Sequence, residues 1–127
     1  MSLIFFITPL KKADYNILRG IWVGNYMNGK VVLNIDKGTC SLEFKKIKLN
    51  RSETITGNCN IDYTKTPNTF IIDNISGVNL SLYSLILIIN ENLIHITNFS
   101  TKWKLRPINF TKKNTIILKK HNLLKGV

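Results

Sequence analysis

"LRGIWVGNYMNGK" (residues 18–30) is the stretch that decides the fold, because it predicts a β-hairpin whose first strand carries a tryptophan. It contains a Gly-x-Trp triplet at 20–22 and the dipeptide Asn28-Gly29. Asn-Gly between two apolar runs favours a type I′ turn, since both residues tolerate positive φ angles. Residues 30–36 then alternate apolar and polar side chains, as a strand with one buried face does. The stretch therefore predicts two antiparallel strands joined at Asn28-Gly29.

The same alternation recurs along the chain, broken by turn residues roughly every eight to twelve positions, which is typical of an antiparallel barrel or sandwich. The expected strands cover residues 20–27, 30–36, 39–45, 54–63, 69–75, 82–90, 93–98 and 114–120. Sequential hairpins most easily close into an up-and-down barrel, because closure removes both edge strands. We predict an all-β, eight-stranded antiparallel up-and-down barrel over residues 13–120, followed by a tail at 121–127.

The charge of the chain is strongly positive, with 18 Lys and Arg against 7 Asp and Glu and a net charge of +11. Such a charge can indicate a nucleic-acid or anionic-membrane partner. However, Lys, Ile and Asn together account for 50 of the 127 residues, and all three have AT-rich codons. The lysines are also scattered rather than clustered in a block. We therefore favour the codon bias of a low-GC bacterial genome over a functional basic face, which stays as the alternative.

The first twelve residues form an apolar segment, 1–12, that includes "SLIFFITPL" at 2–10. Its length suits a signal peptide and is too short for a membrane span, but the lysines follow the apolar run instead of preceding it. The segment is either a signal-peptide remnant, which we favour, or an N-terminal strand or cap of the domain. A remnant predicts a periplasmic or secreted protein, and the other interpretation a cytoplasmic one. No later stretch is long enough for a transmembrane segment.

Cys40 and Cys59, the two cysteines, both fall on the apolar faces of their expected strands. If these strands turn at Leu49-Asn50, the two cysteines are directly opposed and a disulfide becomes possible. A register slipped by two residues would instead leave two buried thiols that pack as small apolar groups. Both alternatives remain open from the sequence.

Aromatic residues are the candidate binding residues, because several are spaced so that they could line one interior. Either they fill a core or they surround a cavity in which a tyrosine hydroxyl orients a ligand. Trp22 is expected to plug the closed end of the barrel, whereas Trp103, between two lysines, is either an exposed binding aromatic or a second plug. The candidate ligand-binding residues are Tyr26, Phe44, Tyr63, Phe70, Tyr83 and Trp103.

Catalytic and metal-binding patterns do not stand out. Two distant histidines and two cysteines fall short of the three or four converging ligands of a metal site. The sequence shows neither a nucleophile at a recognisable spacing from a base nor a glycine-rich phosphate loop. We predict no catalytic residues, no metal and no cofactor.

The order of several short motifs resembles a largely uncharacterised family of small bacterial lipocalin-like proteins that is abundant in planctomycetes. The residues that carry this resemblance are Leu18, Gly20 and Trp22; Asp62, Lys65 and Pro67; Tyr83; and Arg106, Pro107 and Phe110. The resemblance spans roughly residues 13 to 120 and implies a lipocalin-like barrel without an established activity. Lipocalins proper usually place an arginine of the last strand over the tryptophan. This chain offers only Lys119 and Lys120 there.

These observations predict a non-enzymatic barrel that binds a small apolar or amphipathic ligand. The alternative is a protein-binding module, such as an inhibitor or immunity-type protein, whose barrel is filled and whose basic surface docks on an acidic partner. An oligonucleotide-binding barrel should alternate aromatics with lysines on one outward face. Only Trp103, between Lys102 and Lys104, fits that pattern, so nucleic acid is not expected. The sequence leaves the oligomeric state open.

Overall fold

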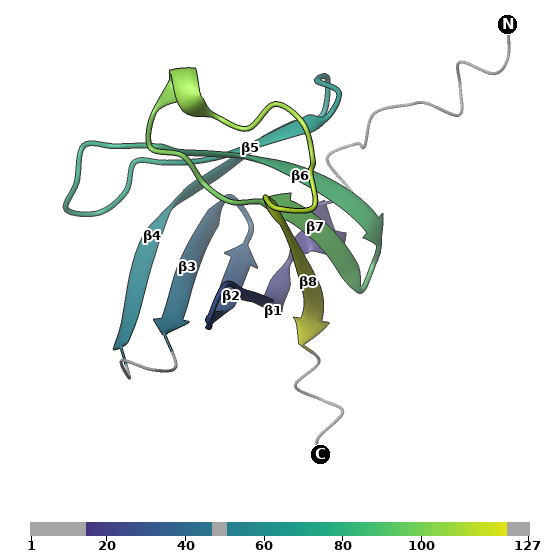
Figure 1. Cartoon of the computed structure of the whole chain (residues 1–127), viewed down its shortest axis with the longest axis horizontal. Coiled ribbons are helices and arrows are strands. Elements are labelled where there is room, and N and C mark those ends of the chain that lie inside the picture. Colours follow the sequence, from purple (N-terminus) through teal and green to yellow (C-terminus); the bar gives the residue numbers. More distant parts are fainter. Residues whose placement is uncertain (1–14, 47–50, 122–127) are drawn as a thin grey trace, which may run out of the picture.

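Eight antiparallel strands close into a barrel in the computed structural model, which describes residues 15–46 and 51–121 (Figure 1). Each strand pairs with the next along the chain, and the last pairs with the first. The elements of the described residues are α1 (Tyr15–Leu18), β1 (Gly20–Tyr26), β2 (Gly29–Asp36), β3 (Thr39–Lys46), β4 (Arg51–Asp62), β5 (Asn68–Asp73), β6 (Leu82–Asn90), β7 (Leu93–Thr97), the 3₁₀ helix η3 (Trp103–Leu105) and β8 (Thr115–His121). The predicted eight-stranded up-and-down barrel is confirmed.

The outer limits of the predicted domain fall largely beyond the described residues. The apolar segment 1–12 lies outside them, as does all of the expected tail except His121, which ends β8. Among the residues that the structure describes, no helix has the length and apolar character needed to cross a bilayer.

The first hairpin turns one residue earlier than the sequence predicts. Tyr26 pairs with Gly29, so Met27 and Asn28 form the turn, and Met27 adopts a left-handed φ of 56°. Gly29 belongs to β2, and a Cβ at this position would lie 2.8 Å from the backbone oxygen of Lys45 on β3. The glycine is therefore needed for close approach of two strands, not for a positive φ angle.

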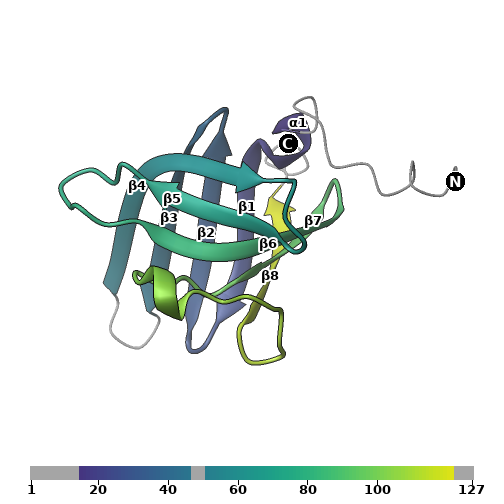
Figure 2. The same cartoon turned by 90° about the horizontal axis from the view of Figure 1, so that it is seen from above.

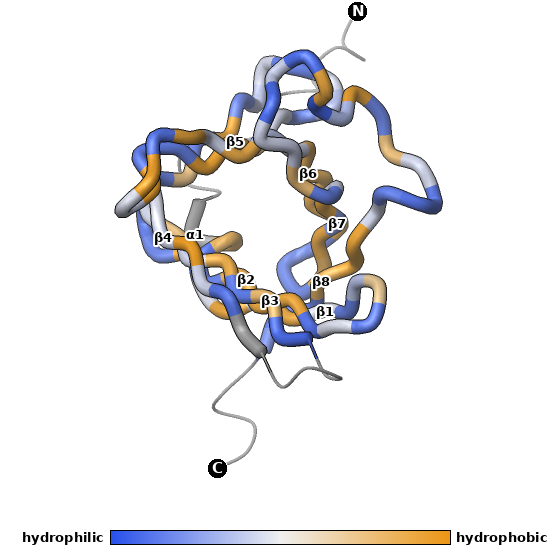
Figure 3. The backbone as a smooth tube through the Cα atoms, turned by 60° about the vertical axis from the view of Figure 1, so that its left-hand side comes forward, coloured by the Kyte–Doolittle hydropathy of each residue, from blue (hydrophilic) through white to orange (hydrophobic). Residues whose placement is uncertain are grey.

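The middle of the barrel is filled by its own side chains. Along β2, Val31, Leu33 and Ile35 are buried while the residues between them are exposed or half-buried, so the period-two alternation directs one set of side chains inward. Figure 3 shows the strands around the barrel with their hydropathy. The largest side chains with less than 2% of their surface exposed are Trp22, Phe70, Leu18, Leu33, Leu42, Ile72, Ile86, Ile94, Ile96, Ile116, Leu118 and Val31.

One end of the barrel, called the closed end below, is sealed where α1 leads into β1 and β8 finishes (Figure 2). Trp22 is fully buried there, and its indole N–H donates a hydrogen bond of 2.8 Å to the carbonyl oxygen of Leu18. The Lys120 ammonium donates to the carbonyl oxygen of Ile17 at 2.8 Å and lies 5.2 Å from the centroid of the Trp22 ring. A cation from the last strand thus covers the tryptophan and bonds a backbone oxygen of α1.

The connection between β7 and β8 folds back onto β6. Tyr83 and Ser100 exchange two backbone hydrogen bonds of 2.8 and 2.9 Å, and the Thr97 hydroxyl accepts the N–H of Leu85 at 2.8 Å. Because the side chains of Ser84 and its even-numbered neighbours face the interior, Leu85 points outward, yet it is only 3% exposed. The outer face of β6 is therefore covered at this point.

Candidate functional site

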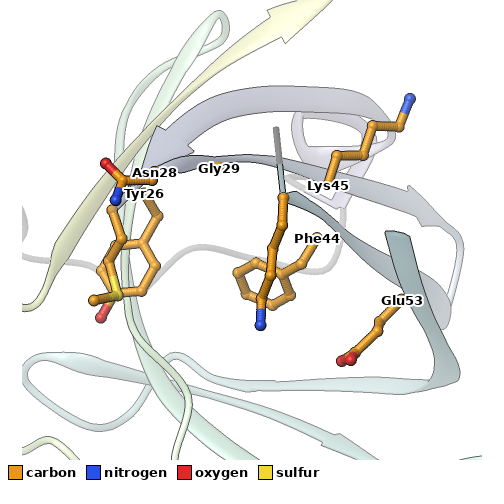
Figure 4. Close-up of a pocket in the computed structure, with 8 residues that line it drawn as sticks. Tyr26, Asn28, Gly29, Phe44, Lys45 and Glu53 are labelled. Carbon is orange, nitrogen blue, oxygen red and sulfur yellow. The ribbon is translucent and has the colours of Figure 1, made fainter. Parts of the chain in front are cut away.

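A pocket of about 590 Å³ lies at the mouth of the barrel, the end opposite the closed end, where β1 and β3 finish and β4 begins (Figure 4). We call it the mouth pocket. Its size falls within the range of about 300–1,000 Å³ that small-molecule sites occupy. The residues that line it are Tyr26, Met27, Asn28, Gly29, Phe44, Lys45, Lys46 and Glu53.

Strand register brings the walls of the mouth pocket together. Gly29 of β2 pairs with Tyr26 on one side and Lys46 on the other, and Phe44 of β3 pairs with Glu53 of β4. Residues paired across a sheet share one face. Phe44 is two positions from the buried Leu42, so this face is the interior one. In Figure 4, Phe44 stands between Tyr26 and Glu53.

The apolar wall of the pocket rests on the filled core. Tyr26 and Phe44 are partly buried and pack against it. Gly29 lies between Tyr26 and Lys46 in the strand register and contributes no side chain to the pocket lining. The two aromatic rings therefore form the apolar wall of the pocket.

Charged groups stand at the rim. Lys46 and Glu53 are exposed and occupy inward register positions. Lys45 occupies the opposite face of β3, where its ammonium lies 3.8 Å from the carboxylate of Glu43, and Figure 4 shows it pointing away from the aromatic wall. The pocket therefore combines an aromatic wall with one cation and one carboxylate at its edge.

The predicted aromatic residues divide among four places, and only two of the six candidates share the mouth pocket. Tyr26 and Phe44 line it. Phe70 is fully buried and makes an edge-to-face contact with Phe99 at 5.9 Å between ring centroids, so it belongs to the core. Tyr63 is half-buried in the connection that follows β4.

Tyr83 and Trp103, the remaining two candidates, meet outside the barrel. Their rings form an edge-to-face contact at 5.3 Å, and the Arg106 guanidinium lies 3.6 Å from the Trp103 ring centroid. A second, polar pocket of about 340 Å³ adjoins Tyr83 and is lined also by residues 74, 78–81 and 101. Trp103 therefore does not plug the barrel.

Sequence reasoning overlooked Met27, Lys46 and Glu53 as residues of the mouth pocket. Strand parity carries the signal for two of them, because Lys46 is two residues after Phe44 and Glu53 is two residues before Ile55, which packs against the core. A charged residue at an inward position near a strand end points to a barrel mouth rather than to a core.

Of the two alternatives for the cysteines, the structure shows the two buried thiols. Cys40 pairs with Gly57, not with Cys59, so the register differs by two residues from the one required, and both cysteines are free and buried. The two side chains still meet diagonally and share a hydrogen bond. This hydrogen bond and the burial of the thiol raise the pKa of Cys59 far above its ordinary value. Apolar alternation fixes the face of a strand on which a cysteine lies but allows its register to shift by two residues, which is why the sequence left both alternatives open.

Asp62 caps the turn after β4. The Asp62 carboxylate accepts hydrogen bonds from the backbone N–H and the hydroxyl of Thr64, which lower the pKa of this exposed group. Within the described ranges, 15–46 and 51–121, no three His, Cys, Asp or Glu side chains are grouped so that they could hold a metal ion.

The closed eight-stranded up-and-down barrel, sealed at one end by a tryptophan under a cation of the last strand, is consistent with a lipocalin-like fold. No protein-family profile, curated protein or solved structure matches the chain.

Proposed function

We propose that this protein is a non-enzymatic binding protein that holds a small amphipathic molecule in the mouth pocket. The apolar part of the ligand would lie against Tyr26 and Phe44, and its polar group would stay at the rim beside Lys46 and Glu53. The observation that carries the proposal is the pocket of about 590 Å³ with aromatic walls and a charged rim.

The filled core supports a ligand that enters only the mouth. Trp22, Phe70 and the aliphatic side chains around them fill the barrel interior between the closed end and the mouth pocket, so no space is left there for a ligand. A wholly filled barrel would favour the alternative of a protein-binding module, but the pocket between β1, β3 and β4 favours a small-molecule ligand.

A titration with the fluorescent amphiphile 1-anilinonaphthalene-8-sulfonate, with dodecanoate as competitor, tests the proposal. We expect saturable fluorescence that dodecanoate displaces, and a loss of roughly tenfold in affinity for Phe44→Ala, because about 1–2 kcal/mol of aromatic contact disappears. Lys46→Gln, which changes only the exposed rim, should weaken dodecanoate without unfolding the protein.

Leu87→Ala, at an exposed position of β6 on the outside of the barrel, is the matched control and should bind the probe as the parent does. Thermal unfolding of each variant excludes dye binding to a loosened core. The proposal fails if the parent shows no saturable binding, or if Phe44→Ala and Leu87→Ala change the affinity equally.

A further inference from the structure

Two neighbouring segments, residues 74–81 and 98–114, expose an unusual amount of apolar surface. We call them together the loop-pair surface. They adjoin one another, because both contribute residues to the pocket beside Tyr83. The large apolar side chains that they expose, at 48–69% of their surface, are Val78, Leu80, Trp103, Leu105 and Ile108. Isolated exposed apolar residues are normal in proteins, whereas five in two adjacent segments indicate an interaction surface.

The charge of this surface is entirely positive. Neither segment contains an Asp or a Glu, and residues 98–114 contain Lys102, Lys104, Arg106, Lys112 and Lys113. The four lysines are exposed, and two of them flank Trp103 directly. A codon bias toward lysine explains their number, and what distinguishes this surface is that the lysines lie beside exposed apolar side chains.

Trp103 is held in a fixed orientation although half of its surface is exposed. Arg106 lies over its ring and donates a hydrogen bond of 2.8 Å to the carbonyl oxygen of Trp103. The Trp103 ring also makes an edge-to-face contact with Tyr83. One face of the indole is therefore already covered by a guanidinium. This arrangement disfavours stacking of a nucleic-acid base and leaves the rim of the indole for an interfacial contact.

The shape of the loop-pair surface favours a membrane over a protein as its partner. Figure 1 shows the connection 74–81 extending beyond the ends of β5 and β6, and the connection 98–114 lying over β6. Exposed apolar side chains on such connections need a matched recess in a protein partner, whereas the headgroup region of a bilayer accepts them without a complementary shape. Trp is also the side chain that favours this region, and lysines beside it attract acidic lipids.

We propose that the loop-pair surface docks on a bilayer that contains anionic phospholipids. Trp103, Leu105 and Ile108 enter the headgroup region, and Lys102 and Lys104 contact lipid phosphates. β7 ends and β8 begins at the mouth of the barrel, so docking holds the mouth pocket near the bilayer. The docking surface itself does not depend on the mouth pocket, which lies on β1, β3 and β4.

Sedimentation of the full chain with vesicles tests this proposal. We expect binding to vesicles of phosphatidylcholine and phosphatidylglycerol in equal amounts, little binding to phosphatidylcholine alone, and release by salt. Tryptophan emission should shift to the blue on binding. The shift reports Trp103, because Trp22 is fully buried already.

Paired variants locate the contact. Lys102→Gln with Lys104→Gln should weaken binding roughly 30-fold, while Lys65→Gln with Lys119→Gln, an equal loss of exposed charge elsewhere, should change it much less. Leu105→Thr with Ile108→Thr should weaken it roughly tenfold. The control, Leu87→Thr with Ile117→Thr, alters two exposed aliphatic side chains on the barrel wall.

The proposal is overturned if anionic vesicles do not bind the protein, if neutral vesicles bind it equally well, or if both members of a variant pair lose binding equally. Quenching of Trp103 by a single-stranded oligonucleotide or by an acidic protein, without vesicle binding, would also overturn it and assign the surface to that partner. All these variants change exposed residues, so circular dichroism should show the parent fold in each.

Discussion

Substitution of Gly24 by alanine should open the barrel at the seam between β1 and β8. A Cβ at this position would lie 2.2 Å from the backbone oxygen of Ile117 and 2.8 Å from Cδ2 of Leu118. The nearer contact is with backbone, so no side-chain rotation relieves it, and the two strands would have to separate by roughly 1 Å in a close-packed interior. The residue pairs that hold this seam are Ile21 with His121, Trp22 with Lys120 and Val23 with Lys119.

The free-energy cost combines two effects. Overpacking costs about 1–3 kcal/mol, and each hydrogen bond lost from the short β1–β8 ladder adds about 1 kcal/mol. We expect Gly24→Ala to lower the free energy of unfolding by about 3 kcal/mol or more, which for a domain of this length corresponds to a Tm lower by roughly 10 °C or more. Thermal unfolding followed by circular dichroism measures it, and Trp22 fluorescence reports whether the closed end opens.

Gly38→Ala is the matched control, because a Cβ at Gly38 would meet no atom within 4 Å. Its Tm should equal that of the parent or rise slightly, since alanine restricts the unfolded chain. If Gly24→Ala unfolds within about 2 °C of Gly38→Ala, the seam tolerates a side chain and this reasoning about barrel closure is wrong.

Two further predictions concern the closed end and the thiols. Lys120→Met should cost about 1–3 kcal/mol, because it removes the contact with Trp22 and a charge-assisted hydrogen bond; the exposed Lys119→Met is the control, and equal Tm values for both variants would contradict the role of Lys120. The pKa of Cys59 is raised in the folded protein, so the folded state keeps a proton that the unfolded chain loses above the ordinary thiol pKa of 9.0. The free energy of unfolding should therefore fall as the pH rises above that value, and it should fall less steeply in Cys59→Ala. The measurement is the difference in Tm between about pH 8 and about pH 10, and an equal difference in the parent and in Cys59→Ala would refute this account.

Local patterns were sufficient to predict the strands and their closure. The alternation in β2 and β3, and the turn residues between strands, produce the observed elements with boundaries displaced by a few residues. This succeeds because the side-chain period of a strand is a local property, and because a sequence of hairpins leaves few ways to hide its edges. The same parity also assigns Phe44 and Leu42 to one face.

Register and placement required the tertiary structure. Cys40 and Cys59 miss direct pairing by two residues, since alternation fixes the face of each strand but not its register. Tyr83 has the parity of an outward residue, but its partner Trp103 comes from a connection twenty residues away and could not be assigned. Contacts of that kind depend on how a long connection folds back over the barrel.

By itself the sequence determined that this chain is an eight-stranded barrel with Trp22 in its first strand, because apolar alternation and turn residues act over a few positions. Only the tertiary structure decided that the middle of the barrel is filled, that Tyr26 and Phe44 share a pocket at its mouth, and that Lys120 covers Trp22. These outcomes depend on the registers of all eight strands at once, since closure sets which residues meet across the interior.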